Sequence, residues 1–392
     1  MAQSKRTTLI HHRYRPPAGF DAPQPGVHKA STVFFSSVAA LRARDWKHKS
    51  GYTYGLHGTP TTFMLEERVA SLEGGLQCVL CPSGLAAIAL VDFALLASGD
   101  EVLIPDNCYG PSKELARNEL ARWGITHRLY DPMDTAAFAR AIGPRTKLAW
   151  FEAPGSVTME FPDLRTLLGI AREAGVTSAL DNTWGAGIAF DGFDLGGGVG
   201  ADVVMHALTK YPSGGGDVLM GSAVTRDEAL HLKLKLAHMR IGVGVGANDA
   251  EALLRSLPSL ALRYEAQDAA AREVAERLAK RGEVVQLLHP AFEESPGHAH
   301  WRSHCSAAAG LFSIVLDQRY GSAQVDALVD RLTLFRIGHS WGGPISLAVP
   351  YNAQSMRSLP TPIRGVLVRF SIGLEAPADL IADLEQAFAA LA

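Results

Sequence analysis

Short apolar runs that each end in a polar or reactive residue are the feature of this sequence that most constrains its fold. From about residue 60 onward these runs alternate with stretches of helical periodicity. Strands separated by helices of ten or more residues need crossover connections, which produce a mostly parallel sheet. The predicted strands are 78–81, 101–104, 148–151, 176–180 and 202–208. Because such sheets bind ligands beyond the carboxyl ends of their strands, we expect the reactive residues there to form a site.

The chain on either side of this region follows other patterns. Residues 1–58 lack clean periodicity and are punctuated by glycine and proline, which predicts an extended arm that lies across another subunit or the main body. Residues 59–248 would form the large cofactor-binding domain. The amphipathic stretch 260–280 predicts one long helix, followed by short strands and a final helix over 377–391. We therefore predict a smaller α+β domain over 249–392.

The composition favours a packed enzyme that acts on small molecules. Hydrophobic residues make up 47% of the chain and charged residues 20%. With 37 basic and 40 acidic side chains, the net charge of −3 gives no strong field that would attract nucleic acid. Four cysteines are too few for a disulfide framework, and the richest apolar run, 85–97, is too short for a membrane helix. We expect a cytoplasmic protein with neither nucleic acid nor membrane as its partner.

Two of the strand ends carry a lysine and an aspartate that suit pyridoxal phosphate. Lys210 precedes a glycine-rich loop and could form a Schiff base with a carbonyl cofactor, although a lysine can also simply mark a strand's solvent end. Asp181 closes the preceding predicted strand, 29 residues earlier. Pyridoxal phosphate needs a carboxylate opposite its ring nitrogen, because the protonated ring accepts electrons from the substrate. Since Asp-Asn is also a common turn starter, both interpretations stay open on these residues alone.

Other residues beside the strand ends fit the same cofactor. The segment 83–85 follows a strand and opens a helix, so its backbone N–H groups could hold a phosphate, although Ser-Gly is also a plain N-cap. Tyr109, on the loop after the next strand, carries a ring that could stack on a planar cofactor. Cys78 and Cys81 form a CxxC without a second ligand pair, and they face opposite sides of a strand. We expect structural cysteines and no metal site.

Together with further motifs, these residues resemble the Cys/Met-metabolism family of pyridoxal-phosphate enzymes, most closely its bacterial cystathionine β-lyases. The similarity spans nearly the whole chain, and so many ordered matches are more specific for the family than for the substrate. The matching segments are 31–35, 72–75, 153–160, 181–184, 207–211, 340–343 and 369–375. The resemblance implies the aspartate-aminotransferase-like α/β fold, known as fold type I, assembled as a homotetramer of two catalytic dimers.

The resemblance also assigns roles around the cofactor. Lys210 would hold pyridoxal phosphate as a Schiff base and later move the Cα proton. Asp181 would pair with the ring nitrogen, and Tyr109 would stack on the ring. The groups that would hold the phosphate are the backbone amides of Gly84 and Leu85, the side chain of Thr209, and Tyr54 acting from a neighbouring subunit. Lys210, Tyr109 and Tyr54 are thus the predicted catalytic residues.

The same resemblance predicts a substrate site in the second half of the chain. Arg369 would bind the substrate α-carboxylate, a task that suits a bidentate guanidinium. Ser340 and Trp341 would complete that carboxylate site. His339 would face the substrate side chain, at a position where the typical β-lyase carries tyrosine and the γ-acting relatives carry glutamate.

A second departure from the family pattern concerns the phosphate. The usual Tyr-Gly-Arg reads Tyr54-Gly55-Leu56 here, so the phosphate-binding arginine is absent. His57 could replace it as a cation or as a neutral N–H donor. In the alternative, the backbone amides, Thr209 and Tyr54 already satisfy the phosphate and His57 does not contact it.

The resemblance implies a pyridoxal-phosphate-dependent carbon–sulfur β-lyase in methionine biosynthesis. Its expected substrate is a small sulfur amino acid, most plausibly cystathionine, which would give homocysteine, pyruvate and ammonia. A cysteine desulfhydrase, a methionine or cystathionine γ-lyase and a γ-synthase are the alternatives within the family. A non-catalytic regulatory protein on the same fold is a more remote alternative, against which the retention of Lys210, Asp181 and Arg369 argues.

Overall fold

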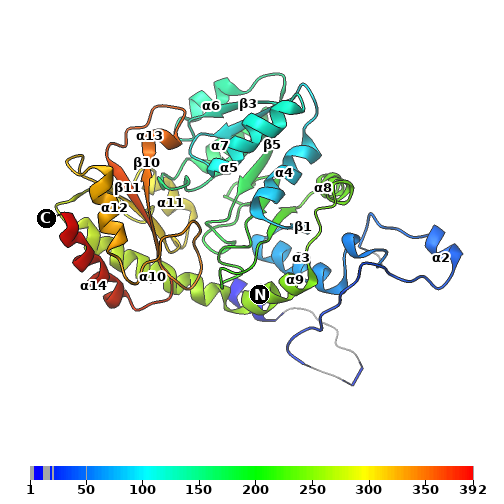
Figure 1. Ribbon diagram of the computed structural model, residues 1–392. Helices are drawn as coiled ribbons and strands as arrows, with labels where there is room; N and C mark the ends of the chain where they lie inside the picture. The colour runs from blue at the N-terminus through cyan, green and yellow to red at the C-terminus, as the bar shows by residue number, and fades with distance from the viewer. Residues whose placement is uncertain (1–3, 12–17, 20–21, 50, 392) are drawn as a thin grey trace.

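Two sheets organise the computed structural model of the chain, which describes residues 4–11, 18–19, 22–49 and 51–391 (Figure 1). The strands are β1 (Gln77–Cys81), β2 (Glu101–Pro105), β3 (Thr126–Tyr130), β4 (Thr146–Glu152), β5 (Thr177–Asp181), β6 (Val203–His206), β7 (Gly221–Thr225), β8 (Val284–Leu288), β9 (Leu311–Leu316), β10 (Leu347–Asn352) and β11 (Val366–Ser371). A seven-stranded sheet has the order β1-β7-β6-β5-β4-β2-β3, and a four-stranded sheet has the order β10-β11-β9-β8.

Most of the α-helices pack on the faces of the two sheets (Figure 1). The α-helices are α1 (Lys5–Ile10), α2 (Val38–Arg42), α3 (Pro60–Glu73), α4 (Gly84–Leu95), α5 (Gly110–Leu115), α6 (Thr135–Ala141), α7 (Leu164–Glu173), α8 (Glu228–Ile241), α9 (Ala247–Ser256), α10 (Leu260–Ala279), α11 (His298–His304), α12 (Ser322–Asp330), α13 (Ala353–Met356) and α14 (Pro377–Phe388). Within the described part of the chain, none of them combines the length and apolar character that crossing a membrane requires.

The large sheet is mostly parallel, as the alternating pattern predicts. Strands β2 to β6 run parallel to one another, whereas β7 is antiparallel to both β1 and β6. The register pairs Glu152 with Asp181, and Asp181 with Met205. The carboxyl ends of β4, β5 and β6 therefore meet at one edge, and this edge carries the site.

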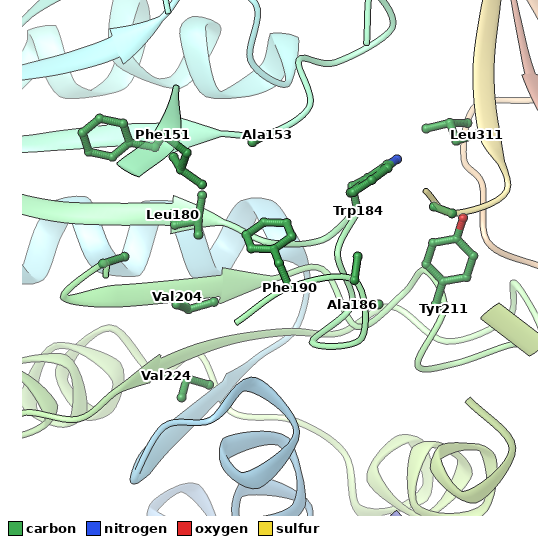
Figure 2. Packing of buried hydrophobic residues seen from close by; sticks show 14 of the residues in the cluster. Phe151, Ala153, Leu180, Trp184, Ala186, Phe190, Val204, Tyr211, Val224 and Leu311 are labelled. Carbon is green, nitrogen blue, oxygen red and sulfur yellow. The ribbon is translucent and has the colours of Figure 1, made fainter. Parts of the chain in front are cut away.

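The core runs without a break from the large sheet to the small one. Figure 2 shows Phe151, Leu180, Val204 and Val224, one from each of the neighbouring strands β4, β5, β6 and β7, in a single cluster of buried side chains. Buried Leu311 of β9 belongs to the same cluster. Because apolar burial contributes about 25 cal/mol per Å², this shared cluster holds the two sheets against each other.

The small sheet is antiparallel and packs beside α10. The predicted helix over 260–280 is confirmed as α10, and the predicted strands near 310–316 and 365–372 are confirmed as β9 and β11. Gln267 of α10 donates from Nε2 to the carbonyls of Gly343 at 2.8 Å and Ile372 at 3.1 Å, so the helix is fastened to the segments that flank β10 and β11. The boundaries predicted at 58/59 and 248/249 remain predictions.

The N-terminal region contains short helices that the sequence pattern did not predict. Residues 1–3, 12–17, 20–21 and 50 of the predicted arm lie outside the described residues. In Figure 1, α2 projects away from the body of the molecule. Phe34 is 92% exposed, and Val38, Leu41 and Tyr54 are exposed as well. A segment with so much uncovered apolar surface cannot make a core of its own. The arm over residues 1–58 and its contact with another subunit remain predictions.

Candidate active site

Lys210 lies where the two sheets meet. It is not at the end of β6, as the apolar run suggested, but in a turn four residues beyond His206, where β6 ends. Its Nζ donates to Ser340 Oγ at 3.0 Å and lies 5.3 Å from the ring centroid of Trp341. Both residues belong to the segment that leads into β10 of the small sheet. The lysine therefore reaches from the large sheet into the predicted substrate site.

The turn that carries Lys210 is fixed from several sides. Tyr211 is fully buried, packs edge-on against Tyr264 of α10 and accepts a hydrogen bond on its hydroxyl from the Gly310 N–H at 2.8 Å. Arg263 of α10 donates to the Tyr211 carbonyl at 2.7 Å. Gly214, at a φ of +70°, lies so close to Arg263 that an added Cβ would be 2.6 Å from the guanidinium carbon. The lysine backbone thus has little freedom to move.

The electrostatic surroundings of Lys210 favour its neutral amine. Burial, and then the positive charge of Arg369, lower the pKa of Lys210 to about 8, although the negative charge of Asp181 acts in the opposite direction. A lysine with an ordinary pKa would be almost wholly protonated at neutral pH. The lowered pKa makes Lys210 a better nucleophile and base than a surface lysine.

Asp181 is paired with a second carboxyl group, Glu152, at the neighbouring strand end. Burial raises the pKa of Asp181, whereas bonds from Thr183 and the charges of His206 and Lys210 act against this rise. Burial and the negative charge of Asp181 raise the pKa of Glu152 well above its usual range. Two adjacent buried carboxyls favour a single negative charge. The pKa of Glu152 is raised further than that of Asp181, which favours the charge on Asp181.

Glu152 also connects Asp181 to Tyr109. The Tyr109 backbone N–H donates to Glu152 Oε2 at 2.8 Å, and the side chain of Tyr109 remains 43% exposed. Burial, followed by the negative charge of the Asp181/Glu152 pair, raises the pKa of Tyr109, which keeps its phenol neutral. Sequence reasoning missed Glu152 as a site residue. The sequence carried a signal for it, because Glu152 ends the predicted strand next to the one that Asp181 ends.

The first turn of α4 lies beside the connection to Lys210. Ser83 caps the helix by accepting from Ala86 N at 3.0 Å, which leaves the N–H groups of Gly84 and Leu85 without partners within the helix. A Cβ on Gly84 would lie 2.6 Å from the Ala207 Cβ, so only glycine permits this close approach. The hydroxyl of Thr209 is already engaged with both backbone groups of Met220, at 3.0 and 3.1 Å. Its phosphate role remains a prediction.

Arg369 of β11 is the remaining charged residue of this site. It is 7% exposed, and its Nη2 donates to the Ser340 carbonyl at 3.3 Å. Its buried Nε has no hydrogen-bond partner among the residues that the structure describes. Ser340 has a φ of +144°, a conformation that side chains rarely adopt and that costs about 1–3 kcal/mol. A buried guanidinium edge with an unpartnered donor is suited to receive a carboxylate.

Tyr54 and its neighbours lie elsewhere in the single chain. Tyr54 and Leu56 line a cavity of about 630 Å³ together with Lys29 and residues 244–249, and the lining does not include Lys210. His57 shares a 2.8 Å hydrogen bond with Thr53 through Nδ1. Burial, followed by the charges of Lys235 and Arg44, lowers the pKa of His57. Within a single chain, Tyr54 therefore lines a different cavity from the predicted site around Lys210.

These features fit pyridoxal phosphate. The structure provides an amine with a lowered pKa, a buried carboxylate beside it, a helix start with free N–H groups, and an unpartnered guanidinium donor for a substrate anion. Lys210, Asp181, Tyr109 and the first turn of α4 are the groups that would hold the cofactor. His339, the predicted side-chain contact, is exposed, and its ring centroid lies 6.5 Å from that of Tyr351.

Comparison with known proteins identifies the family of this chain and its cofactor. Residues 6–389 match the family described as Cys/Met metabolism PLP-dependent enzyme. A cystathionine beta-lyase of Bordetella avium is 39% identical over 389 residues, which cover 97% of this chain and 96% of that protein. A putative cystathionine beta-lyase of Rhizobium johnstonii is 37% identical over 375 residues, covering 95% and 92%.

Solved structures of enzymes that act on sulfur amino acids share this fold. A cystathionine gamma synthase from Xanthomonas oryzae pv. oryzae, crystallised with aminoacrylate and cysteine, matches with a TM-score of 0.90 at 29% identity over 100% of this chain and 99% of that chain. The predicted fold type I and the predicted cofactor, pyridoxal phosphate, are confirmed. The chain belongs to the Cys/Met-metabolism family of pyridoxal-phosphate-dependent enzymes.

Proposed function

We propose that this enzyme is a carbon–sulfur β-lyase whose substrate is cystathionine. The observation that carries the proposal is the link from Lys210 Nζ to Ser340 Oγ at 3.0 Å, and from the Ser340 carbonyl to Arg369 at 3.3 Å. This link sets a base beside the residue that would bind the α-carboxylate. The relatives named as cystathionine beta-lyases support the same reaction.

The side chains divide the reaction between them. When bound, pyridoxal phosphate supplies an electron sink for the negative charge that develops at the substrate Cα. Arg369 binds the α-carboxylate, and Asp181, kept ionised, holds a negative charge for the ring nitrogen. Lys210 accepts the Cα proton, since its pKa of about 8 leaves part of the amine neutral near neutral pH. Cleavage of the Cβ–S bond then releases homocysteine as a thiol, and hydrolysis of the remainder gives pyruvate and ammonia.

Identification of the oxo acid made from cystathionine tests this function. β-Elimination gives pyruvate, whereas γ-elimination gives 2-oxobutyrate. The second outcome needs testing because His339 replaces both the tyrosine and the glutamate of the known patterns, and because a gamma synthase shares the fold. We expect pyruvate and homocysteine in equal amounts. 2-Oxobutyrate as the main product would assign the enzyme to the γ-acting branch. If neither pyruvate nor 2-oxobutyrate forms, cystathionine is excluded as the substrate.

The enzyme is further proposed to act as a homotetramer of two catalytic dimers in the cytoplasm. The exposed apolar side chains of the N-terminal arm need a covering surface, which a second copy would provide. The four cysteines are unpaired, which suits a reducing compartment. In such a dimer Tyr54 would complete the site of the neighbouring chain.

Mixing two inactive variants should restore activity if Tyr54 acts across the dimer. We expect Tyr54→Ala and Lys210→Ala each to be inactive alone. At equal mixing, half of the dimers carry one chain of each kind and one intact site, which predicts about a quarter of the native activity. Pyruvate release after subunit exchange is the measurement. Exchange verified by mass spectrometry without any recovered activity would show that each chain builds its own site.

His57 is not expected to bind the phosphate as a cation. A pKa below the ordinary value of about 6.5 keeps the imidazole mostly neutral from pH 7 upward, so retention of the cofactor should have the same pH dependence in the native enzyme and in His57→Ala between about pH 7 and pH 8. Cofactor dissociation followed by dialysis at several pH values is the measurement. Leu56→Arg is the matched variant and should tighten retention, because a charge-assisted hydrogen bond contributes about 1.5–3 kcal/mol. Retention that weakens as pH rises, in the native enzyme only, would contradict this expectation.

A further inference from the structure

Tyr351 packs against the residue that would bind the substrate carboxylate. It lies on β10, whose register places Val349 opposite Arg369 of β11. Tyr351 is two residues further along the strand, so it is the diagonal neighbour of Arg369 on the same face of the sheet. The guanidinium carbon of Arg369 lies 5.3 Å from the centroid of the Tyr351 ring, within the range of a cation–π contact.

Few other contacts orient this guanidinium. Its hydrogen bond to Ser340 O is long, at 3.3 Å, and its Nε has no partner. Burial lowers the pKa of Arg369, and no carboxylate acts against this shift among the described residues. Buried arginines are usually fixed by a carboxylate, and the described part of the chain supplies none to Arg369. The flat ring is therefore the main surface that restricts rotation of the guanidinium.

Packing against the core holds the Tyr351 ring in place. The ring is half-buried and packs against the core that joins the two sheets. His339 lies on the same ring, with a centroid distance of 6.5 Å and an interplanar angle of 56°. Tyr351 thus contacts the carboxylate-binding residue and also approaches the residue predicted to face the substrate side chain.

We propose that Tyr351 is a positioning residue for Arg369: its ring face holds the guanidinium so that the unpartnered Nε edge points to the substrate α-carboxylate. The hydroxyl is not needed for this role. The inference rests on the proposed function only in that the ligand is an α-amino acid. It extends to any substrate with a free α-carboxylate.

Affinities of the cofactor-loaded enzyme for two small probes test this role. L-Alanine carries the carboxylate and L-alaninamide lacks it, and the binding of each is followed by the change in the absorption spectrum. Tyr351→Leu should weaken L-alanine binding by about three- to thirtyfold, the range expected from loss of a cation–π contact. Binding of L-alaninamide should stay within about twofold, and Tyr351→Phe should behave as the native enzyme for both probes.

With cystathionine, Tyr351→Leu should raise KM more than it lowers kcat. Tyr320→Leu is the control, since it removes another tyrosine ring that lies 4.8 Å from an arginine, Arg319, outside the site. Equal weakening of both probes, or a Phe variant as weak as the Leu variant, would overturn the proposal. If the probe pattern holds while cystathionine is not cleaved, the proposed function fails and the role of Tyr351 stands.

Discussion

Lys210→Ala is expected to lower kcat for cystathionine cleavage by at least about a thousandfold, since general-base catalysis alone contributes about a hundred- to ten-thousandfold. The variant also removes the amine that would hold the cofactor. Lys210 Nζ makes one hydrogen bond, to Ser340, and its lowered pKa shows that the charged form is not well stabilised in the folded protein. The loss of activity should therefore occur without loss of stability.

Pyruvate release and thermal unfolding, measured on the same preparations, check this expectation. Lys233→Ala is the matched control, because Lys233 is an exposed lysine of α8 away from the site. It should keep native activity. Substantial turnover by a folded Lys210→Ala enzyme would show that another group moves the proton.

Asp106→Ala is expected to destabilise the protein by about 3–5 kcal/mol, the usual cost of leaving a buried charge without its partner. Asp106 follows β2 and is 3% exposed. Its side chain accepts from Lys113 Nζ at 3.2 Å, and from the backbone N–H groups of Ser358 at 3.0 Å and Leu359 at 2.9 Å. Removal of the carboxylate leaves the Lys113 charge with carbonyl partners instead of an anion, and it weakens the attachment of the segment that follows α13 to the large sheet.

Chemical denaturation and amide hydrogen exchange of residues 353–360 would measure this effect. Glu119→Ala is the control, because its ion pair with Arg122 is exposed and such pairs contribute at most about 1 kcal/mol. The double variant Asp106→Ala/Lys113→Met should recover part of the loss, since it removes the stranded charge as well. Equal stability of Asp106→Ala and Glu119→Ala would contradict the assigned role.

Much of the large sheet could be predicted because its inner strands are buried on both faces. Such strands appear in the sequence as continuous apolar runs, as in β2 and β6, and the residues that end them are visible as breaks in the pattern. β3 escaped prediction because it is an edge strand with alternating exposure. β7 escaped because it is rich in small residues, and because a glycine loop rather than a helix precedes it.

The candidate site was predictable where residues share a strand end and not where they meet through tertiary packing. Asp181 and Lys210 could be paired from their spacing and order along the chain. Glu152 could have been added from the same logic. The contact of Tyr351 with Arg369 depends on the register of β10 and β11, which nothing in the local sequence fixes. The lowered pKa of His57 depends on its burial and on the charge of Lys235, which is distant in sequence.

Peptide mapping after borohydride reduction tests the central claim most directly, namely that Lys210 is the residue that carries the cofactor. Reduction should convert the labile Schiff base between cofactor and lysine into a stable amine. Digestion should then place one reduced cofactor per chain on the peptide that contains Lys210. Two other buried lysines, Lys113 and Lys235, serve as internal comparisons within the same digest. Label on Lys210 alone is the predicted result, and label on either of the other lysines, or none on Lys210, would contradict the account.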